Sequence, residues 1–294
     1  MALNDEYYAV IEAGGTKFNC AIVNKAKEVV EQVRVPTALP EKTLNACVDF
    51  FKAQREAGYD FKQMGIGSFG PLDLNPQSDT YGFITKTPKP NWSYVSIAPF
   101  FADALNCDVV IDTDVNAAAL AESRWGAAQG TDVCVYITVG TGVGGGVVIH
   151  GKPLHGLVHP EIGHFKVIPP DGIQGVCPFH GNCVEGLASG TSLGKIWGQP
   201  SDTLADDHPA WDKLTDVLAQ LCHNLLVGLS AQRIIFGGGV MQKQGIVERI
   251  IDKTQISLND YIVLPPKVAF SDIICLPGLG TQSGVLGALA LLDT

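Results

Sequence analysis

The sequence lacks an excess of basic residues. Its 294 residues include 20 lysines and arginines against 30 aspartates and glutamates, which gives a formal net charge of −10. A protein that binds nucleic acid or an anionic membrane through a broad basic face needs the opposite balance. The composition therefore argues against both partners, and an anionic substrate needs a local binding site.

Long apolar runs are also missing. No run reaches about 18 apolar residues, the length that indicates a membrane-spanning helix. The first six residues contain neither a basic nor an apolar segment, so no signal peptide is predicted. We therefore expect a cytoplasmic protein, in which the eight cysteines are reduced or metal-bound rather than paired in disulfides.

The P-loop motif is absent, and so is a complete dinucleotide-binding motif. Two stretches, Gly65 to Gly70 and Gly140 to Gly145, have the glycine spacing of a dinucleotide site. Pro71 follows the first stretch, however, and an apolar strand follows the second. Both contexts lack the helix whose N-terminus would bind the phosphates, so neither stretch predicts a dinucleotide site.

Strand and helix patterns alternate along the chain. Residues 7–11 and 18–23 predict a hairpin around a glycine turn, and residues 133–139 and 147–149 predict a similar one. Helical spacing is found over residues 41–57, 97–105, 115–128, 210–229 and 280–292. The predicted fold class is therefore α/β, with two related lobes. We expect a small lobe of residues 1–112, joined by the C-terminal helix at about 281–294, and a large lobe of residues 113–280.

Three glycine turns follow predicted strands and are candidates for phosphate binding. Glycine places no side chain between a backbone N–H group and a ligand, although each turn alone can also be purely structural. Together with nearby hydroxyls, an acid and a lysine, they suggest a nucleoside triphosphate bound between the lobes. The candidate residues are Glu12, Gly14, Gly15, Thr16, Lys17, Gly140, Thr141, Gly142, Gly237, Gly238 and Gly239.

A histidine and cysteine cluster indicates a metal. Cys177, His180 and Cys183 have the spacing Cys-x2-His-x2-Cys, and His164 precedes them. Zinc in structural sites takes four nitrogen or sulfur ligands, so a closed set of this kind predicts a structural ion. The alternative is a set of unrelated surface histidines and buried thiols.

Three carboxylates are candidates for catalysis or substrate binding. Asp114 lies between a predicted strand and a predicted helix, where it can act as an N-cap or as a general base. Glu161 and Glu185 flank the cysteine cluster and can accept hydrogen bonds from a polyol. For the two glutamates, solvated loop charge is the alternative.

These motifs together resemble the ROK sugar kinases of the actin/hexokinase-like, or ribonuclease H-like, fold, and within them the bacterial fructokinase branch. The resemblance implies a cleft between two lobes that holds sugar and ATP. The matching stretches are residues 12–17, 65–71, 114–119, 138–144, 159–164, the cysteine cluster with 185–190, and 237–241. They follow the family order across nearly the whole chain.

The resemblance implies roles for individual residues. Asp114 would take the proton from a sugar hydroxyl, with the ATP phosphates near the first two glycine turns and the adenosine near the third. Glu161, His164 and Glu185 match sugar-contacting positions, and His164 would also bind zinc. Glu12 stands where many members have aspartate, which weakens its assignment to Mg²⁺.

The resemblance also implies a substrate class. A Glu-Asn-Asp pattern in the glucokinases is replaced here by Asp112-Thr113-Asp114, which argues against glucose and makes Thr113 a marker of sugar choice. We expect an ATP-dependent fructokinase that forms fructose 6-phosphate, with Mg²⁺ and Zn²⁺, as a homodimer. A mannokinase or a broad hexose kinase is the alternative. A non-catalytic sugar-sensing relative is disfavoured, because the first glycine turn at residue 12 leaves no room for a DNA-binding helix-turn-helix.

Overall fold

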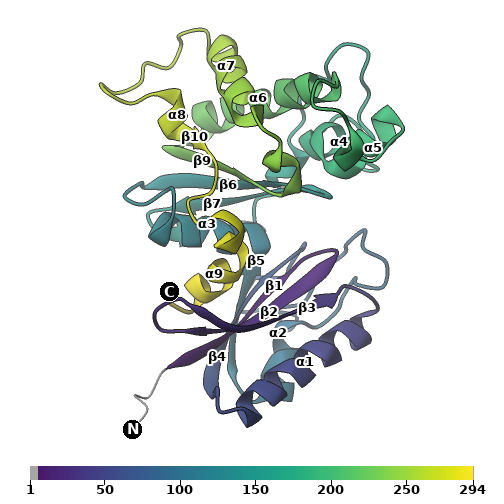
Figure 1. The fold of residues 1–294 in the computed structure, drawn as a ribbon, viewed down its shortest axis with the longest axis vertical. Coiled ribbons are helices and arrows are strands. Elements are labelled where there is room, and N and C mark those ends of the chain that lie inside the picture. Colours follow the sequence, from purple (N-terminus) through teal and green to yellow (C-terminus); the bar gives the residue numbers. More distant parts are fainter. Residues whose placement is uncertain (1–5, 294) are drawn as a thin grey trace. The chain divides into compact units, whose positions relative to one another are not determined.

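The computed structural model describes residues 6–293, and these form two compact units (Figure 1). The first unit contains the described residues up to Arg124, the segment Lys152–His159 and the residues from Thr281 onward. The second unit contains Trp125–Gly151 and Pro160–Gly280. Among the described residues, no helix has the length and apolar character needed to cross a membrane.

The first unit is built on a mixed five-stranded sheet. Its strands are β1 (Tyr7–Ala13), β2 (Lys17–Asn24), β3 (Val29–Pro36), β4 (Phe61–Ser68) and β5 (Asp108–Thr113), in the order β3-β2-β1-β4-β5. The first three strands pair antiparallel, and β4 and β5 continue the sheet in parallel with β1. Its helices are α1 (Pro40–Glu56), α2 (Ala98–Leu105), α3 (Asp114–Trp125) and α9 (Ser283–Ala290).

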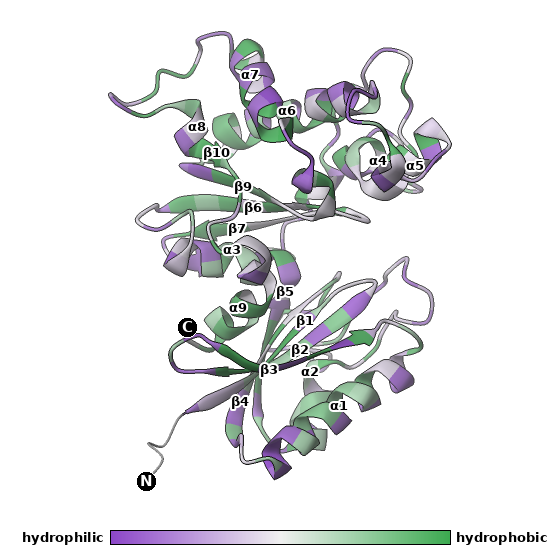
Figure 2. Cartoon of the chain, viewed as in Figure 1, coloured by the Kyte–Doolittle hydropathy of each residue, from purple (hydrophilic) through white to green (hydrophobic). Residues whose placement is uncertain are grey.

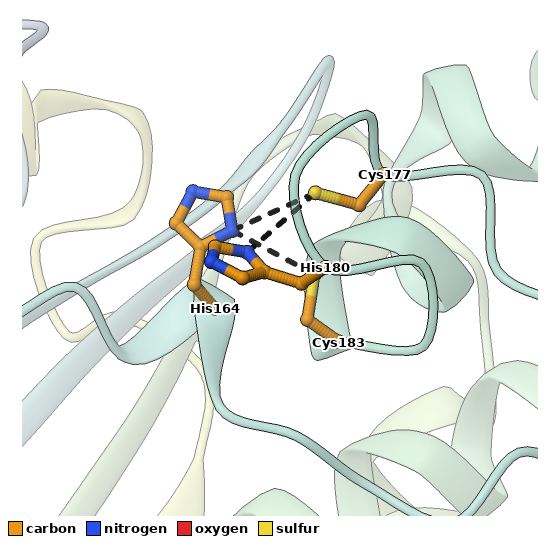
Figure 3. A group of neighbouring side chains, drawn as sticks. All are labelled: His164, Cys177, His180 and Cys183. Atoms are coloured by element: carbon orange, nitrogen blue, oxygen red, sulfur yellow. Dashed lines mark hydrogen bonds between the residues drawn. The ribbon is translucent and has the colours of Figure 1, made fainter.

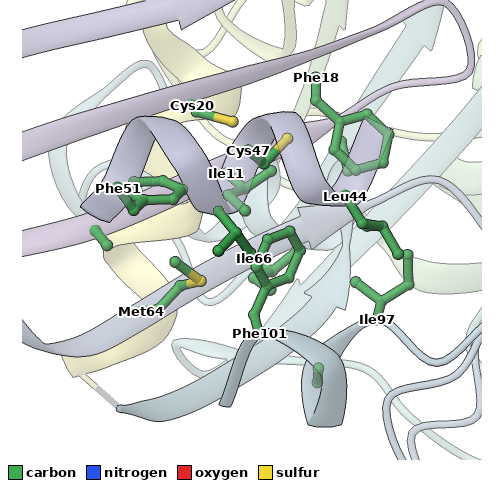
Figure 4. Packing of buried hydrophobic residues seen from close by; sticks show 14 of the residues in the cluster. Ile11, Phe18, Cys20, Leu44, Cys47, Phe51, Met64, Ile66, Ile97 and Phe101 are labelled. Carbon is green, nitrogen blue, oxygen red and sulfur yellow. The ribbon is translucent and has the colours of Figure 1, made fainter. Parts of the chain in front are cut away.

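Alternate residues of a strand point to opposite faces of its sheet, so each strand supplies side chains to both faces. In this sheet, helices pack against both faces. On one face Ile11, Phe18 and Ile66 pack with Phe51 of α1 and Phe101 of α2 (Figure 4). Each of these five side chains is fully buried. Burial of one such side chain contributes roughly 1.5–3 kcal/mol.

The other face of the sheet packs against α9 at close range. A Cβ atom built on Gly65 of β4 would lie 1.8 Å from the carbonyl oxygen of Ala288. Only glycine at position 65 therefore permits this approach of helix to strand.

The second unit has a mixed sheet of its own. Its strands are β6 (Val133–Val139), β7 (Val143–Ile149), β9 (Arg233–Gly237) and β10 (Ile274–Cys275), in the order β10-β9-β6-β7. The two-residue strand β8 (Lys152–Pro153) lies in the segment that belongs to the first unit. Its helices are α4 (Val184–Ala188), α5 (Gly190–Trp197), α6 (Ala210–Leu229), α7 (Ile246–Leu258) and α8 (Phe270–Ile273). Figure 2 shows hydrophobic residues along the central strand β6, whose side chains are mostly buried.

The predicted two-lobed α/β class is confirmed, and most predicted elements are present. Two of the predicted helices are longer than the helices in the structure. The helix predicted over 115–128 stops at Trp125, because Gly126 follows it and glycine is a poor helix former. The helix predicted over 280–292 is shorter: α9 covers Ser283–Ala290, and 3-10 turns precede and follow it. Gly280 has a φ of +58°, which an α-helix does not accommodate. The predicted lobe boundaries at residues 112 and 280 stay a prediction.

Candidate functional site

The junction between β5 and α3 presents Asp114 at the first position of the helix. The hydroxyl of Thr113 accepts the N–H of Asn116 at 3.1 Å, so Thr113, rather than Asp114, is the N-cap. Asp114 Oδ1 accepts the N–H of Val115 at 2.9 Å. The strand end and the cap together fix the backbone that carries the Asp114 carboxylate.

The Asp114 carboxyl has the properties of a proton acceptor. Burial, and after it the negative charge of Glu12, raise the pKa of this carboxyl to about 6, although the hydrogen bond from the N–H of Val115 acts in the opposite direction. A pKa near 6 leaves the group mostly ionised at neutral pH but more basic than an ordinary aspartate. This combination suits a general base.

A second carboxylate at this junction is paired with a histidine that the sequence did not single out. Asp112 is buried, and its Oδ2 lies 2.8 Å from His155 Nε2. Asp112 Oδ1 accepts the side-chain N–H of Asn116 at 2.8 Å and the backbone N–H of Thr113 at 2.7 Å. The hydrogen bond from His155 to Asp112 raises the pKa of His155. No sequence pattern links residues 112 and 155, which only the fold brings together.

The first glycine turn is held in one conformation by its neighbours. Thr37 Oγ1 donates to the carbonyl of Gly14 at 2.8 Å, and Lys89 Nζ donates to that of Gly15 at 2.5 Å. The Thr16 and Lys17 side chains remain exposed. The turn therefore offers a hydroxyl and an ammonium group on a fixed backbone.

Glu12 lies at the end of β1, beside this turn. Its Oε2 accepts a hydrogen bond from Asn19 Nδ2 at 2.6 Å. A Cβ atom on Gly284 would lie 2.2 Å from the Glu12 carboxyl carbon. The close contact between α9 and the Glu12 side chain therefore requires glycine at position 284. These contacts fix the direction of a half-buried carboxylate next to the predicted phosphate turn.

The second and third glycine turns contribute to a pocket of about 810 Å³ inside the second unit. Gly140, Thr141 and Gly239, three of the residues predicted to bind the nucleotide, line this pocket. The other predicted glycines of these two turns, Gly142, Gly237 and Gly238, do not line it. A Cβ atom on Gly237 would lie 2.1 Å from the Tyr136 hydroxyl, and Gly238 has a φ of +94°. In the structure, those two glycines serve close packing and a left-handed backbone.

Most of the pocket wall comes from residues that sequence reasoning missed. They are Gly190, Thr191 and Gly194 of α5, together with Pro200, Ser201, Asp202, Trp211, Val240, Gln242 and Lys243. The spacing of Gly190 and Gly194 was the available signal, because residues four apart share one face of a helix. A Cβ atom on Gly190 would lie 3.0 Å from the carbonyl oxygen of Gly140, whereas one on Gly194 would meet only ordinary contacts.

The predicted metal ligands come together in the second unit. His164, Cys177, His180 and Cys183 point toward one another (Figure 3), with one donor atom from each within 4.8 Å of the others. Nδ1 of His164 lies 3.6 Å from Cys183 Sγ and 4.0 Å from Cys177 Sγ. Nδ1 of His180 lies 3.8 Å from Cys177 Sγ.

This geometry fits zinc. Zn–N and Zn–S bonds of about 2.0–2.3 Å in a tetrahedron separate the ligand atoms by about 3.3–3.8 Å, close to the distances found here. Burial raises the pKa of the Cys183 thiol to about 11, so a free thiol stays protonated. A bound cation would shift that balance to the thiolate, which is the metal-binding form.

The two candidate glutamates occupy different settings. Glu161 is exposed, and its backbone carbonyl accepts the N–H of His164 at 2.9 Å. Glu185 lies in the first turn of α4, and its Oε2 accepts the N–H of Val143 at 3.0 Å. The Glu185 carboxylate is thus already engaged with the end of the second glycine turn.

Comparison with known proteins accounts for both units. Residues 8–294 match the model of the ROK family. The chain is 46% identical to a fructokinase of Zymomonas mobilis, covering 99% of this chain and 98% of that protein. It is 38% identical to a fructokinase of Pediococcus pentosaceus, covering 96% of both chains.

A solved structure agrees with these sequence matches. The crystal structure of the ROK hexokinase of Thermus thermophilus is similar with a TM-score of 0.77 and 28% identity, over 98% of this chain and 97% of that one. The family match, the identities and the shared two-unit architecture lead to one conclusion: this chain belongs to the ROK family.

Proposed function

We propose that this chain is an ATP-dependent fructokinase that converts D-fructose to fructose 6-phosphate. The observation that carries the proposal is the 46% identity, over nearly the whole of both chains, to a protein named as a fructokinase. The side chains at the β5–α3 junction and in the pocket of the second unit supply chemistry that suits this reaction.

Asp114 acts as the general base. As the oxygen of the 6-hydroxyl forms its bond to the γ-phosphorus of ATP, the carboxylate takes the hydroxyl proton and the bond from that phosphorus to the β–γ bridging oxygen breaks. ADP is the leaving group. Phosphoryl transfer depends mainly on positioning and on charge stabilisation, so a carboxylate fixed at a helix start is well suited to this role.

ATP binds with its adenosine in the pocket of the second unit. The base lies against Gly194 in this proposal, and Gly140, Thr141, Gly190 and Gly239 also line the pocket. Thr16 and Lys17 of the first turn are phosphate ligands in this proposal. Mg²⁺ supplies charge neutralisation at the phosphates when it is bound, and we propose Glu12 as the carboxylate that contacts it.

The histidine and cysteine cluster holds zinc. All four donors are nitrogen or sulfur atoms, and their spacing matches a closed tetrahedral set, which leaves no open position for a water molecule. The ion therefore has a structural role. It ties the segment that contains Glu161 and His164 to the segment that leads into α4.

The hexose contacts are proposed for Glu161, His164, Glu185 and Thr113. One or two hydroxyl contacts can decide between sugars, so mannose is the alternative acceptor. The Thr113 hydroxyl already caps α3, which leaves its methyl group and its backbone as the parts that can shape the sugar site. A homodimer and a cytoplasmic location remain predictions from the sequence and the resemblance.

A coupled assay of ADP formation tests the proposed function. Fructose, mannose, glucose and N-acetylmannosamine are compared as acceptors at equal concentrations with ATP and Mg²⁺. We expect fructose to give the highest kcat/KM. The name fructokinase is wrong if fructose ranks among the poorest of the four sugars.

A further inference from the structure

Glu185 makes a contact that a purely sugar-binding side chain does not need. Its Oε2 accepts the N–H of Val143 at 3.0 Å, and Val143 is the first residue of β7 after the second glycine turn. A Cβ atom on Gly142 would lie only 2.6 Å from the same oxygen. The carboxylate therefore lies directly against the turn.

The other end of this turn is held by the same part of the chain. The N–H of Gly190, which begins α5, donates to the carbonyl of Gly140 at 2.7 Å. The Ser192 hydroxyl, also in α5, donates to the backbone carbonyl of Glu185 at 2.6 Å. Glu185, the pocket helix α5 and the turn thus form one hydrogen-bonded group.

Several residues of this hydrogen-bonded group line the pocket of the second unit. Gly140, Thr141 and Gly190 line the proposed nucleotide site, and Gly142 lies next to them in the chain. A turn of glycines has many accessible conformations, so its shape depends on the contacts that restrain it. The Glu185 carboxylate supplies a charge-assisted hydrogen bond, which is a strong restraint of this kind.

Two of the metal ligands lie next to the residues of the Glu185–Val143 hydrogen bond. His164 follows Gly163, and a Cβ atom on Gly163 would lie 1.8 Å from the carbonyl oxygen of Val143. Cys183 precedes Glu185 by two positions, and its sulfur accepts the N–H of Gly186 at 3.4 Å. The cluster therefore links the segment of His164, which contacts the Val143 carbonyl, to the segment of Cys183 and Glu185, which contacts the Val143 N–H.

We infer that Glu185 is a positioning residue for the nucleotide, which fixes the second glycine turn through the Val143 N–H. This inference rests on the proposed function, because it takes the pocket of the second unit as the ATP site. It adds a role for Glu185 that is separate from any contact with the sugar. It also connects the metal cluster to ATP affinity through the residues that flank its ligands.

Two substitutions at this position separate reach from charge. Glu185→Gln keeps the length of the side chain and a carbonyl oxygen that can accept the Val143 N–H. Glu185→Asp keeps the charge but is one methylene shorter, so it withdraws the acceptor from that N–H. ATP binding to each full-length variant is measured without sugar by isothermal titration calorimetry, and bound zinc is measured on the same samples.

We expect Glu185→Asp to weaken ATP binding about tenfold, in line with the loss of a hydrogen bond to a charged group. We expect Glu185→Gln to weaken ATP binding less, by about threefold, because its reach is retained and only the charge of the acceptor is lost. Glu248→Asp and Glu248→Gln are the matched controls, because Glu248 is exposed on α7, and both should bind ATP normally.

Three outcomes decide the matter. ATP binding to Glu185→Asp that equals the wild type overturns the positioning role. A loss in Glu185→Gln with normal binding in Glu185→Asp overturns it too, because the charge would then matter instead of the reach. A wild-type protein that binds no ATP contradicts the proposed function itself, which separates the two failures.

The metal supplies an independent measurement. Removing bound zinc with a chelator should weaken sugar-free ATP binding in the wild type by about the same factor as Glu185→Asp. In Glu185→Asp the further loss should be smaller, because both changes act on one turn and coupled sites are not additive. Equal losses in both proteins would separate the cluster from the turn and overturn the proposed connection.

Discussion

The buried carboxylate of Asp112 lies 2.8 Å from Nε2 of His155, a residue that follows it by 43 positions in the chain. The same carboxylate accepts the backbone N–H of Thr113 and the side chain of Asn116. The pair is thus attached to the backbone that carries Asp114. A buried carboxylate with three donors helps to define the start of α3.

His155→Gln should lower the melting temperature more at pH 6 than at pH 9. The pKa of His155 is raised above its ordinary value of 6.5, so the pair stabilises the fold fully below that value. The stabilisation is lost as the pH rises through the raised pKa. Because His155 is partly exposed, we expect a drop of about 1–3 °C at pH 6, measured by differential scanning calorimetry. His150→Gln, an exposed histidine, is the control, and a drop that does not depend on pH would contradict the pairing.

Asp114→Asn should fold normally and lose most of its turnover. Removal of a general base costs about 10²–10⁴ in rate. The acidic limb of the wild-type kcat/KM profile, which reports the free enzyme, should have an apparent pKa of about 6, because protonation of Asp114 below that pH removes the base. Steady-state kinetics from pH 5 to 9 provide the measurement. Asp103→Asn, an exposed aspartate on α2, should keep wild-type rates. A wild-type kcat in Asp114→Asn would exclude Asp114 as the base.

The purified protein should contain one zinc ion per chain, and its zinc affinity should fall as the pH is lowered. Burial raises the pKa of Cys183, so metal binding must release protons that acid solution restores. A competition titration with a chromogenic chelator between pH 6 and 8 measures the effect. Cys183→Ser should lose the ion, and Cys107→Ser, in the first unit, should retain it. Elemental analysis that finds no metal in protein prepared without chelator would count against the site.

Gly194→Leu should raise the KM for ATP about tenfold with little change in the KM for the sugar. A Cβ atom on Gly194 would meet only ordinary contacts at 3.7 Å and 3.9 Å, so the backbone tolerates a side chain. The added side chain then fills space in the pocket. Gly228→Leu, on α6 where nothing lies within 4 Å, is the control for the change of residue type. An unchanged KM for ATP would move the adenosine out of this pocket.

Local patterns were enough for many of the elements and for the metal cluster, although β3, α5 and α7 were not predicted. The helix predicted over residues 210–229 matches α6 at both ends, and the strand predicted over 133–139 matches β6. The candidate metal ligands were recognised because three of them lie within seven residues and share a ligand chemistry. Helix ends were less accurate where a glycine decided the boundary, as at Gly126 and Gly280.

The sequence by itself determined the two-lobed α/β class, the carboxylate at the start of α3 and the composition of the metal cluster, because each depends on residues close together in the chain. The tertiary structure alone decided which glycines line the pocket, that His155 meets Asp112, and that Glu185 holds the turn at Val143. Those contacts join residues 42 or 43 positions apart in the last two cases. Their formation depends on how strands and helices pack, which no local pattern encodes.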